Sequence, residues 1–282
     1  MSGVEVSVVI PTWNGGALLD KTLQAIFAQR TARSFEVVVV DSGSDAATMA
    51  ILRRHPVELI EIPNAEFNHG LTRDLGADRA SGRYLIFINQ DATPGDESWL
   101  DEMVRPLVDA PEVLAVQGGI RERDDVPRFY WDSCGPRFYF TSEATRWIRR
   151  YHGIGFSTVN CAIRRETWAE HRFGRMDTFE DKAFQRQIHR TGREIASTAA
   201  FVRHTHDYDF EQLRRRCREE GYGWRLVGED YSWWRSVRDM FSARNCWRLL
   251  RGLATGRIRS WAEIVYPFMR SRWVFQGNHR GP

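Results

Sequence analysis

Apolar and polar residues alternate in two distinct patterns over the first ninety positions of the chain. Short β-branched runs predict buried strands at residues 4–11, 35–41, 58–62 and 84–89. Apolar residues at helical spacing predict helices over 17–30, 47–55 and 71–80, the last stopping at Ser81-Gly82. Strands and helices that alternate in this way predict an α/β fold, with a parallel central sheet covered by helices on both faces.

The pattern weakens beyond Pro111. We expect strands over 113–120, 156–163 and 195–202, and helices over 180–190 and 210–220. The stretch 121–155 is rich in Pro, Gly and aromatic residues and is predicted to be irregular. Residues 224–273 predict two or three amphipathic helices.

Polar residues follow three of the predicted strands. The three sequences are Pro11-Thr-Trp-Asn14, Asp41-Ser-Gly-Ser-Asp45 and Asn89-Gln-Asp91. In open α/β sheets the ligand binds outside the carboxyl ends of the strands. We therefore expect these three loops to meet at one rim of the sheet and to form the binding site.

Composition narrows the class of protein. The chain has 282 residues, of which 42% are hydrophobic and 27% charged, enough for one large domain with an extension or for two small domains. No apolar run approaches the ~20 residues of a bilayer span, and no signal peptide is expected. The four cysteines are far apart in sequence, which excludes CxxC clusters and favours reduced thiols in a cytoplasmic protein.

The net charge of +3 is distributed unevenly. Residues 225–282 hold eleven Arg and four acids, and six of the eleven Trp lie between Trp224 and Trp273. This segment either packs on the domain or on a second copy, or lies at an anionic membrane surface. Packing is favoured because the arginines can also form a solubilising face. Nucleic acid is not an expected partner, since the body of the chain is not basic.

Two common nucleotide-binding signatures are missing. The position after the first strand holds Thr12-Trp-Asn-Gly-Gly16 in place of GxGxxG, and no GxxxxGK[ST] loop occurs. Dehydrogenases and P-loop NTPases are therefore disfavoured.

Several segments, in order, resemble family 2 glycosyltransferases of the GT-A fold over roughly residues 4–220. They are Val8-Val-Ile-Pro-Thr-Trp-Asn14, Val40-Asp-Ser-Gly-Ser-Asp45, Arg73-Asp-Leu-Gly-Ala77, Gly82-Arg-Tyr-Leu-Ile-Phe-Ile-Asn-Gln-Asp91 and Phe179-Glu-Asp181. Others are similar to the bacterial rhamnosyltransferase branch, namely Phe67-Asn-His-Gly-Leu-Thr-Arg73, Asn89-Gln-Asp-Ala-Thr-Pro94, Val159-Asn-Cys-Ala-Ile-Arg164 and His204-Thr-His-Asp-Tyr208. The resemblance implies a Rossmann-like GT-A domain over 1–222, with a donor half (1–110) and an acceptor and catalytic half (111–222). Residues 223–282 form a basic, Trp-rich helical extension.

A nucleotide-sugar donor would be held at the strand ends. Asp41 can accept the N3–H of uracil or thymine, or cap its own turn. Thr12 and Asn14 would line the base and ribose, or serve the turn alone. Arg73 could reach the diphosphate, or be a solvated helix residue, and His69 would shape the same pocket. The other expected donor-site residues are Pro11, Ser42, Asn89 and Gln90.

The resemblance places the DxD metal motif of the family at Asn89-Gln90-Asp91, where the first acid is replaced by an amide. Asp91 is then the main carboxylate ligand, His204 the second ligand and His206 a reserve. Alternation along an extended segment would put both rings on one face, although the two histidines could also be a simple turn. Mg or Mn is the expected cofactor, because no thiolate cluster is present.

Glu180-Asp181 opens a predicted helix. The resemblance assigns Asp181 as general base and places Glu180 beside it, touching the acceptor or the donor sugar. The alternative is that both acids merely complement the helix dipole. One base and one displacement would invert the anomeric configuration. Gln212-Leu-Arg-Arg-Arg216 departs from the QxxRW signature of processive synthases, which favours single addition.

The expected function is an inverting, metal-dependent, non-processive transfer of L-rhamnose from dTDP-rhamnose to a hydroxyl of a glycan, a lipid-linked or a small-molecule acceptor. One alternative is a UDP-hexose or UDP-N-acetylhexosamine transferase of the same fold. Another is an inactive nucleotide-binding scaffold in polysaccharide assembly, which the amide of Asn89 favours. The expected location is the cytoplasm or the inner face of the cell membrane. Candidate acceptor residues are Trp131, Tyr139, Arg149 and His152.

Overall fold

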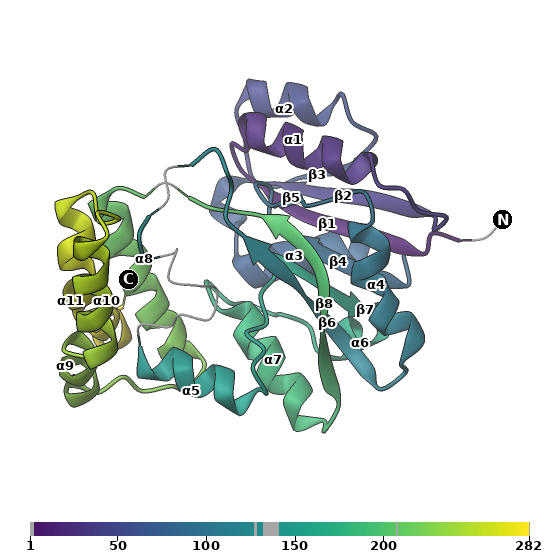
Figure 1. Ribbon diagram of the computed structural model, residues 1–282. Coiled ribbons are helices and arrows are strands. Elements are labelled where there is room, and N and C mark those ends of the chain that lie inside the picture. Colours follow the sequence, from purple (N-terminus) through teal and green to yellow (C-terminus); the bar gives the residue numbers. More distant parts are fainter. Residues whose placement is uncertain (1–2, 127–128, 132–140, 207, 282) are drawn as a thin grey trace. The chain divides into compact units, whose positions relative to one another are not determined.

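The computed structural model describes residues 3–126, 129–131, 141–206 and 208–281 (Figure 1). Contacts within the chain divide it into two compact units. The first unit contains Met1–Glu122 and Ile154–His204, and the second contains Arg123–Gly153 and Thr205–Pro282. Each unit is thus assembled from two separate stretches of the sequence.

The first unit is built on one eight-stranded sheet with the strand order β3-β2-β1-β4-β7-β6-β8-β5. The strands are β1 (Val6–Thr12), β2 (Phe35–Asp41), β3 (Glu58–Glu61), β4 (Tyr84–Ile88), β5 (Thr93–Pro94), β6 (Val113–Arg121), β7 (Asn160–Arg164) and β8 (Glu194–Arg203). The pairs β2–β3, β1–β2, β1–β4 and β6–β8 are parallel, as the sequence predicts. Strand β7 runs antiparallel to both β4 and β6, and β5 runs antiparallel to β8.

Helices cover both faces of this sheet (Figure 1). They are α1 (Gly16–Phe27), α2 (Ala46–Leu52), α3 (His69–Arg79), α4 (Trp99–Asp109), α6 (Arg165–Glu170) and α7 (Glu180–Arg190), with a 3-10 turn at Asn64–Glu66. Alternate residues of a strand point to opposite faces. Val8 therefore packs with α1 and α4, whereas Val9 packs in a second apolar cluster with α3 and α7.

Local chemistry explains three differences from the predicted elements. Helix α3 starts at His69 because the Asn68 side chain caps it by accepting the Leu71 N–H. Gly82 is no left-handed cap. A Cβ there would lie 2.6 Å from the Ser7 nitrogen, so the residue serves a close backbone approach. The stretch 121–155 holds a helix, α5 (Ser142–Arg150), which buries Glu143, Ala144 and Trp147. The sequence pattern missed this helix because the Pro and Gly residues around it favour an irregular segment.

In the part of the second unit that the structure describes, there are five helices, α5 and four further ones. These are α8 (Phe210–Leu226), α9 (Trp233–Met240), α10 (Ala243–Ala254) and α11 (Trp261–Arg280), which agrees with the helices predicted there. Helices α8 and α11 approach each other at glycines, since a Cβ on Gly221 would lie 2.0 Å from the Val274 carbonyl oxygen. The predicted boundary between residues 222 and 223 falls inside α8. Among the described residues, no helix combines the length and the apolar content that crossing a bilayer requires.

Candidate functional site

The carboxyl ends of β1, β2 and β4 lie side by side in the first unit. Thr12 at the end of β1 pairs in register with Asp41 at the end of β2. The Trp13 N–H donates to the Gln90 amide oxygen (3.0 Å), and the Gln90 amide donates back to the Trp13 carbonyl (3.0 Å). This reciprocal pair joins the loop after β1 to the loop after β4. The prediction that these loops meet at one rim of the sheet is confirmed.

Asn14 joins the loop after β1 to the loop after β2. Its backbone is left-handed (φ 47°), a conformation that Asn tolerates better than most residues. Its N–H donates to the Ser44 hydroxyl (2.8 Å), and its side-chain oxygen accepts from the Asp45 N–H (2.8 Å). Ser44 and Asp45 were not among the predicted site residues, although both lie in the Asp41–Asp45 segment that follows the strand.

Asp41 is buried and caps its own turn. One carboxylate oxygen accepts from the N–H groups of Gly43 (3.1 Å) and Ser44 (2.9 Å), and the other accepts from the Ser44 hydroxyl (2.5 Å). The turn role that the sequence left open is therefore present. Each oxygen can accept more than one hydrogen bond, so binding of a base by Asp41 stays a prediction.

Thr12 and Ser42 are the buried residues at the base of this rim. The Ser42 N–H and hydroxyl both donate to the Thr12 carbonyl, at 2.9 and 3.1 Å. The Thr12 hydroxyl oxygen is buried without a hydrogen-bond partner among the residues that the structure describes. Pro11 precedes Thr12 on β1 and pairs with Val40. Roles of Pro11, Thr12 and Ser42 in donor binding stay predictions.

Arg73 is buried on α3 rather than solvated, so the interpretation of a solvated helix arginine is wrong. Its guanidinium donates to the His69 carbonyl (3.0 Å) and to the Asn89 side-chain oxygen (3.0 Å). It also forms an ion pair with Glu180, with 3.3 Å between Nη1 and Oε1. Arg73 thus connects α3, the loop after β4 and the start of α7. Contact with a diphosphate stays a prediction.

Glu180 and Asp181 differ in environment although they are adjacent. Burial tends to raise the pKa of Glu180, but Arg73, His69 and the Thr158 hydroxyl (2.8 Å) together hold that pKa below its ordinary value. Burial raises the pKa of Asp181, against the opposing effect of Lys182, whose Nζ lies 3.3 Å from Oδ2. Glu180 is therefore the more acidic member of the pair, and Asp181 is the one with the higher proton affinity.

The residue before this pair has an unusual backbone. Phe179 is left-handed (φ 62°), which is rare for a bulky residue. Such conformations cost free energy and cluster at functional sites. This observation supports, independently of any motif, the interpretation that the first turn of α7 is functional.

Buried polar contacts hold the segment before α7 against α3. The Asn68 side-chain oxygen accepts from the Met176 N–H (3.0 Å), and its amide donates to Asp177 (2.8 Å). Asp74 accepts from the Trp168 indole and the Gly174 N–H, both at 2.8 Å. Sequence reasoning missed these residues. The capping position of Asn68 was a readable signal, but the long-range partners of Asp74 and the Thr158 contact to Glu180 had none.

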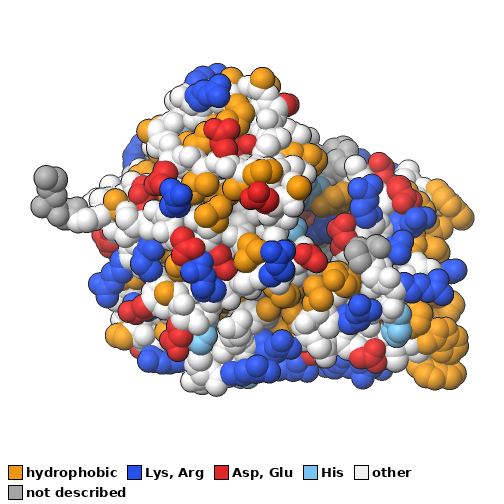
Figure 2. Space-filling model, turned by 180° about the vertical axis from the view of Figure 1, so that it is seen from behind, with side chains coloured by type: hydrophobic (Ala, Val, Ile, Leu, Met, Phe, Trp, Pro, Cys, Tyr) orange, Lys and Arg blue, Asp and Glu red, His pale blue; other side chains and the backbone are white. Residues whose placement is uncertain are grey.

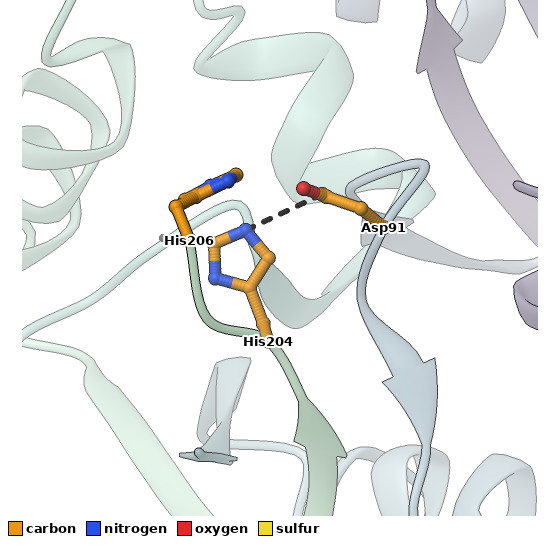
Figure 3. Close-up of side chains that lie close together, drawn as sticks. All are labelled: Asp91, His204 and His206. Atoms are coloured by element: carbon orange, nitrogen blue, oxygen red, sulfur yellow. Dashed lines mark ion pairs between the residues drawn. The ribbon is translucent and has the colours of Figure 1, made fainter. Parts of the chain in front are cut away.

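Asp91 and His204 come together because β5 pairs with β8. The register places Thr93 opposite Arg203. Asp91 lies two residues before Thr93 and His204 directly follows Arg203, so the two side chains come close together. The His204 Nε2 lies 3.3 Å from the Asp91 Oδ1 (Figure 3). His206 follows two positions after His204 along the chain. One ligand atom from each of Asp91, His204 and His206 lies within 4.8 Å of the others. A carboxylate and two imidazoles fit a divalent transition-metal ion such as Mn²⁺. The role of these three residues as metal ligands stays a prediction.

The four predicted acceptor candidates have different outcomes. Arg149 lies in α5 of the second unit and His152 follows it, whereas Trp131 is part of the packing of that unit. Trp131 is buried and donates its indole N–H to the Glu263 carbonyl (2.7 Å). Arg149 and His152 are exposed. Tyr139 lies outside the described residues, as does Cys134. The other three cysteines, Cys161, Cys217 and Cys246, are free thiols.

With this geometry in view, comparison with known proteins decides the family. Residues 7–173, more than half of the chain, match the model of "Glycosyl transferase family 2". The chain belongs to glycosyl transferase family 2. The predicted family is thus confirmed, and the match spans the three strand-end loops and most of the sheet.

Two curated relatives of this family 2 chain are named O-antigen chain rhamnosyltransferases. It is 32% identical over 117 residues to "O-antigen chain rhamnosyltransferase RfbN" of Salmonella typhimurium, which covers 41% of this chain and 37% of that protein. It is 25% identical over 224 residues to "O-antigen chain rhamnosyltransferase WbaN" of Salmonella anatum, which covers 76% of this chain and 70% of that protein. The chain thus spans little more than a third of the first relative.

Solved structures show that the fold is that of the GT-A glycosyltransferases. The mannosyltransferase PcManGT of Pyrobaculum calidifontis, in complex with GDP-Man and Mn²⁺, has a TM-score of 0.64 at 16% identity and covers 100% of this chain and 87% of its own. Glucosyl-3-phosphoglycerate synthase of Mycobacterium tuberculosis, with Mn²⁺, UDP-glucose and phosphoglyceric acid, has a TM-score of 0.62 at 20% identity and covers 81% of both chains. The predicted α/β architecture with C-terminal helices is confirmed.

Proposed function

We propose that this protein transfers a sugar from a nucleotide-sugar donor to a hydroxyl of an acceptor, with inversion at the anomeric carbon. The observation that carries the proposal is the linkage of the loops after β1, β2 and β4 through Trp13–Gln90 and Asn14–Asp45. These links make one continuous polar rim at the carboxyl ends of parallel strands, where nucleotides bind in sheets of this class. Membership of the family supports the same conclusion.

Asp181 is the proposed general base. A base must lose its own proton before it accepts one, and it accepts more readily when its pKa is nearer the working pH. Burial shifts the pKa of Asp181 in that direction, whereas Glu180 is held charged by Arg73. Asp181 therefore receives the acceptor proton as the acceptor oxygen attacks the anomeric carbon and the bond to the diphosphate breaks, which releases the nucleoside diphosphate. Glu180 orients a sugar hydroxyl. A single displacement of this kind inverts the configuration.

Asp91 and His204, with His206 in reserve, would hold a divalent cation, Mg or Mn. That cation supplies neutralisation of the diphosphate charge that builds up as the glycosidic bond breaks. Asn89 adds no negative charge here, and its oxygen accepts from Arg73. The chain thus offers the cation one carboxylate from this loop, whereas a DxD motif would offer two. The two relatives of known structure described above were solved with Mn²⁺.

L-Rhamnose from a dTDP-linked donor is the proposed sugar, and a glycan or lipid-linked glycan the proposed acceptor. The names of the two Salmonella relatives support this assignment. A UDP-hexose donor is the second candidate, which the UDP-glucose complex of the mycobacterial relative favours at the level of the fold. We place the proposed reaction in the cytoplasm.

A panel of donors tests the proposal. Binding of dTDP-rhamnose, UDP-glucose, UDP-N-acetylglucosamine and GDP-mannose is measured by calorimetry with Mn²⁺, and acceptor-free hydrolysis of each donor is followed by release of the nucleoside diphosphate. We expect dTDP-rhamnose to bind most tightly and to be hydrolysed slowly. If UDP-glucose binds most tightly, the second candidate donor replaces dTDP-rhamnose in the proposal. Binding of a donor without hydrolysis would favour the inactive nucleotide-binding scaffold. No binding of any donor would overturn the proposal.

A pair of glutamine variants localises the binding. Gln90→Ala removes both hydrogen bonds that link two loops of the rim and should weaken donor binding by up to about thirtyfold, since each of the two bonds contributes ~1 kcal/mol. Gln24→Ala, on the exposed face of α1, is the matched control and should leave donor affinity unchanged. Equal affinities of both variants would place the donor away from this rim.

A further inference from the structure

Helix α9 of the second unit has its polar side inward. Its buried residues are Ser236 and Asp239. The Ser236 hydroxyl donates to the Ser271 carbonyl (3.0 Å), and Asp239 accepts from the Tyr231 hydroxyl (2.9 Å). The two tryptophans that begin the helix, Trp233 and Trp234, are exposed instead. This arrangement is the reverse of an ordinary surface helix, which buries its apolar stripe.

Helix α10 repeats the reversal. Of its twelve residues, all of them described, only Asn245 and Gly252 are buried. Gly252 faces the interior closely, because a Cβ there would lie 2.6 Å from the Tyr130 ring. Trp247 and Leu250 face outward, three residues apart and therefore on one side of the helix. Burial of each of these two side chains would stabilise the fold by about 2 kcal/mol or more. The fold therefore leaves a substantial apolar surface exposed to solvent.

Together these helices and the first residue of α11 present what we call the exposed aromatic face. It consists of Trp233, Trp234, Phe241, Trp247, Leu250, Leu253 and Trp261, which are 46–75% exposed. Figure 2 shows hydrophobic side chains gathered at the right-hand edge of that view, on the C-terminal helices. The predicted packing of this segment holds for Trp224 and Trp273, which are buried. The other four tryptophans of the segment are exposed. Contiguous apolar surface of this kind marks an interaction site.

The charge around this face is strongly positive. Residues 233–261 contain seven arginines and a single acid, Asp239, which is buried. The arginines are Arg235, Arg238, Arg244, Arg248, Arg251, Arg257 and Arg259. Arg251 lies over the Trp247 ring, 5.4 Å from its centre. Tryptophan interleaved with arginine is the composition of helices that lie in the headgroup region of a bilayer.

We propose that the exposed aromatic face docks onto the surface of an anionic lipid bilayer, with α9 and α10 lying in the plane of the headgroups. A second copy of the chain is the less favourable occupant. Five of the seven arginines are exposed, whereas Arg235 pairs with the buried Glu143 (3.3 Å) and Arg248 is half-buried. A two-fold dimer through this face would bring the exposed arginines of both copies together, with no exposed acid between Trp233 and Trp261 to compensate them. Lipid phosphates supply the missing negative charge. This inference does not depend on the donor or on catalysis.

Vesicle flotation of the full chain tests the proposal. One set of vesicles contains 30% phosphatidylglycerol in phosphatidylethanolamine, and the other is pure phosphatidylcholine. We expect binding to the anionic set alone, weakened in 0.5 M NaCl because salt screens the arginines. Arg238→Gln, Arg244→Gln and Arg251→Gln combined should weaken the binding on the order of 100-fold, since each basic residue contributes about 1 kcal/mol. The matched control combines Arg30→Gln, Arg53→Gln and Arg79→Gln, exposed arginines of the first unit, and should bind as the unchanged chain does.

The aromatic residues are tested separately. Trp234→Ser with Trp247→Ser should abolish flotation, while Val108→Ser, an exposed apolar residue on α4, should leave it intact. Thermal unfolding confirms that each variant is folded. No flotation of the unchanged chain, equal flotation with phosphatidylcholine, or undiminished flotation of the tryptophan variant would each overturn the proposal. So would sedimentation showing a dimer that the tryptophan variant converts to a monomer without any vesicle binding.

Discussion

Arg73 on α3 and Glu180 on α7 form a buried ion pair, with 3.3 Å between Nη1 and Oε1 and side chains that are only 4% and 5% exposed. Neither residue is close to the other in sequence. The same arginine donates to Asn89 in the loop after β4. The guanidinium of Arg73 therefore fixes the start of the proposed catalytic helix α7 relative to the strand ends.

Removing one partner of this pair should destabilise the protein. Arg73→Met leaves Glu180 charged and buried, which costs about 3–5 kcal/mol at pH 7. In the folded protein the pKa of Glu180 lies below its ordinary value of 4.5. The ion pair therefore stabilises the fold fully above pH 4.5, and this stabilisation is lost as the pH falls through the lower pKa of the folded state. Urea unfolding should therefore show a larger loss at pH 7 than at pH 4. The double variant Arg73→Met with Glu180→Gln should recover part of the stability, and a purely additive loss would argue against direct coupling.

Asp181→Asn should lower the turnover of the proposed transfer by roughly 10²–10⁴-fold, the usual contribution of a general base. The amide oxygen still accepts from the Lys182 N–H, so the local fold and the affinity for the donor should persist. Turnover is measured by release of nucleoside diphosphate in the presence of acceptor, and donor affinity by calorimetry. A variant with near-normal turnover would remove Asp181 from the mechanism.

The acid limb of the pH–rate profile should respond to Lys182. Burial raises the pKa of Asp181 above its ordinary value of 3.8, and Lys182 opposes that rise. Lys182→Met removes the opposing charge, so the pKa of Asp181 rises further and the rate should be lost at a higher pH than in the unchanged protein. Lys182 also contacts the Phe156 carbonyl, so thermal unfolding is recorded for the variant. An acid limb that does not move would indicate that another group titrates.

Chelation should abolish transfer, and Mg²⁺ or Mn²⁺ should restore it. Independently of activity, Mn²⁺ binding followed by electron paramagnetic resonance should weaken in Asp91→Asn and in His204→Gln, because each removes one proposed ligand. The chain offers a matched control in the His55–Asp20 pair, which has the same chemistry at 2.8 Å but belongs to the packing of α1 and α2. His55→Gln should bind Mn²⁺ normally. Full activity in chelator would assign charge neutralisation to Arg73 and its neighbours.

Gly70→Ala should destabilise the protein strongly and lower activity. A Cβ at residue 70 would lie 2.0 Å from the Gly174 carbonyl oxygen, so α3 and the segment before α7 would have to separate. We expect a loss of roughly 3 kcal/mol, typical of overpacked contacts, measured by urea unfolding. Gly3→Ala, where a Cβ would meet nothing within 4 Å, is the control and should change stability little. Equal stabilities would show that the contact relaxes without cost.

The sequence located seven of the eight strands, most of the helices and the rim of polar loops, because buried β-branched runs, helical periodicity and strand-end polarity are local signals. The two-residue strand β5 was not predicted, because it is too short to show a pattern. The sequence also singled out Asp91 with His204 and His206, which the β5–β8 pairing brings together. Their roles, and those of Asp41 and Asp181, stay predictions. The sequence analysis did not predict α4, α5 or α6. Helix α5 buries Ala144 and Trp147 at helical spacing, but the stretch around it is rich in Pro and Gly, which favours an irregular segment.

Only the tertiary structure decided which polar residues serve each other. Arg73 reads as a surface residue in the sequence, and its burial depends on partners at positions 89 and 180. The same holds for α9 and α10, whose amphipathic pattern is plain in the sequence while the direction of its apolar side is not. Periodicity defines that a helix has two faces, but only the surrounding contacts determine which face turns inward.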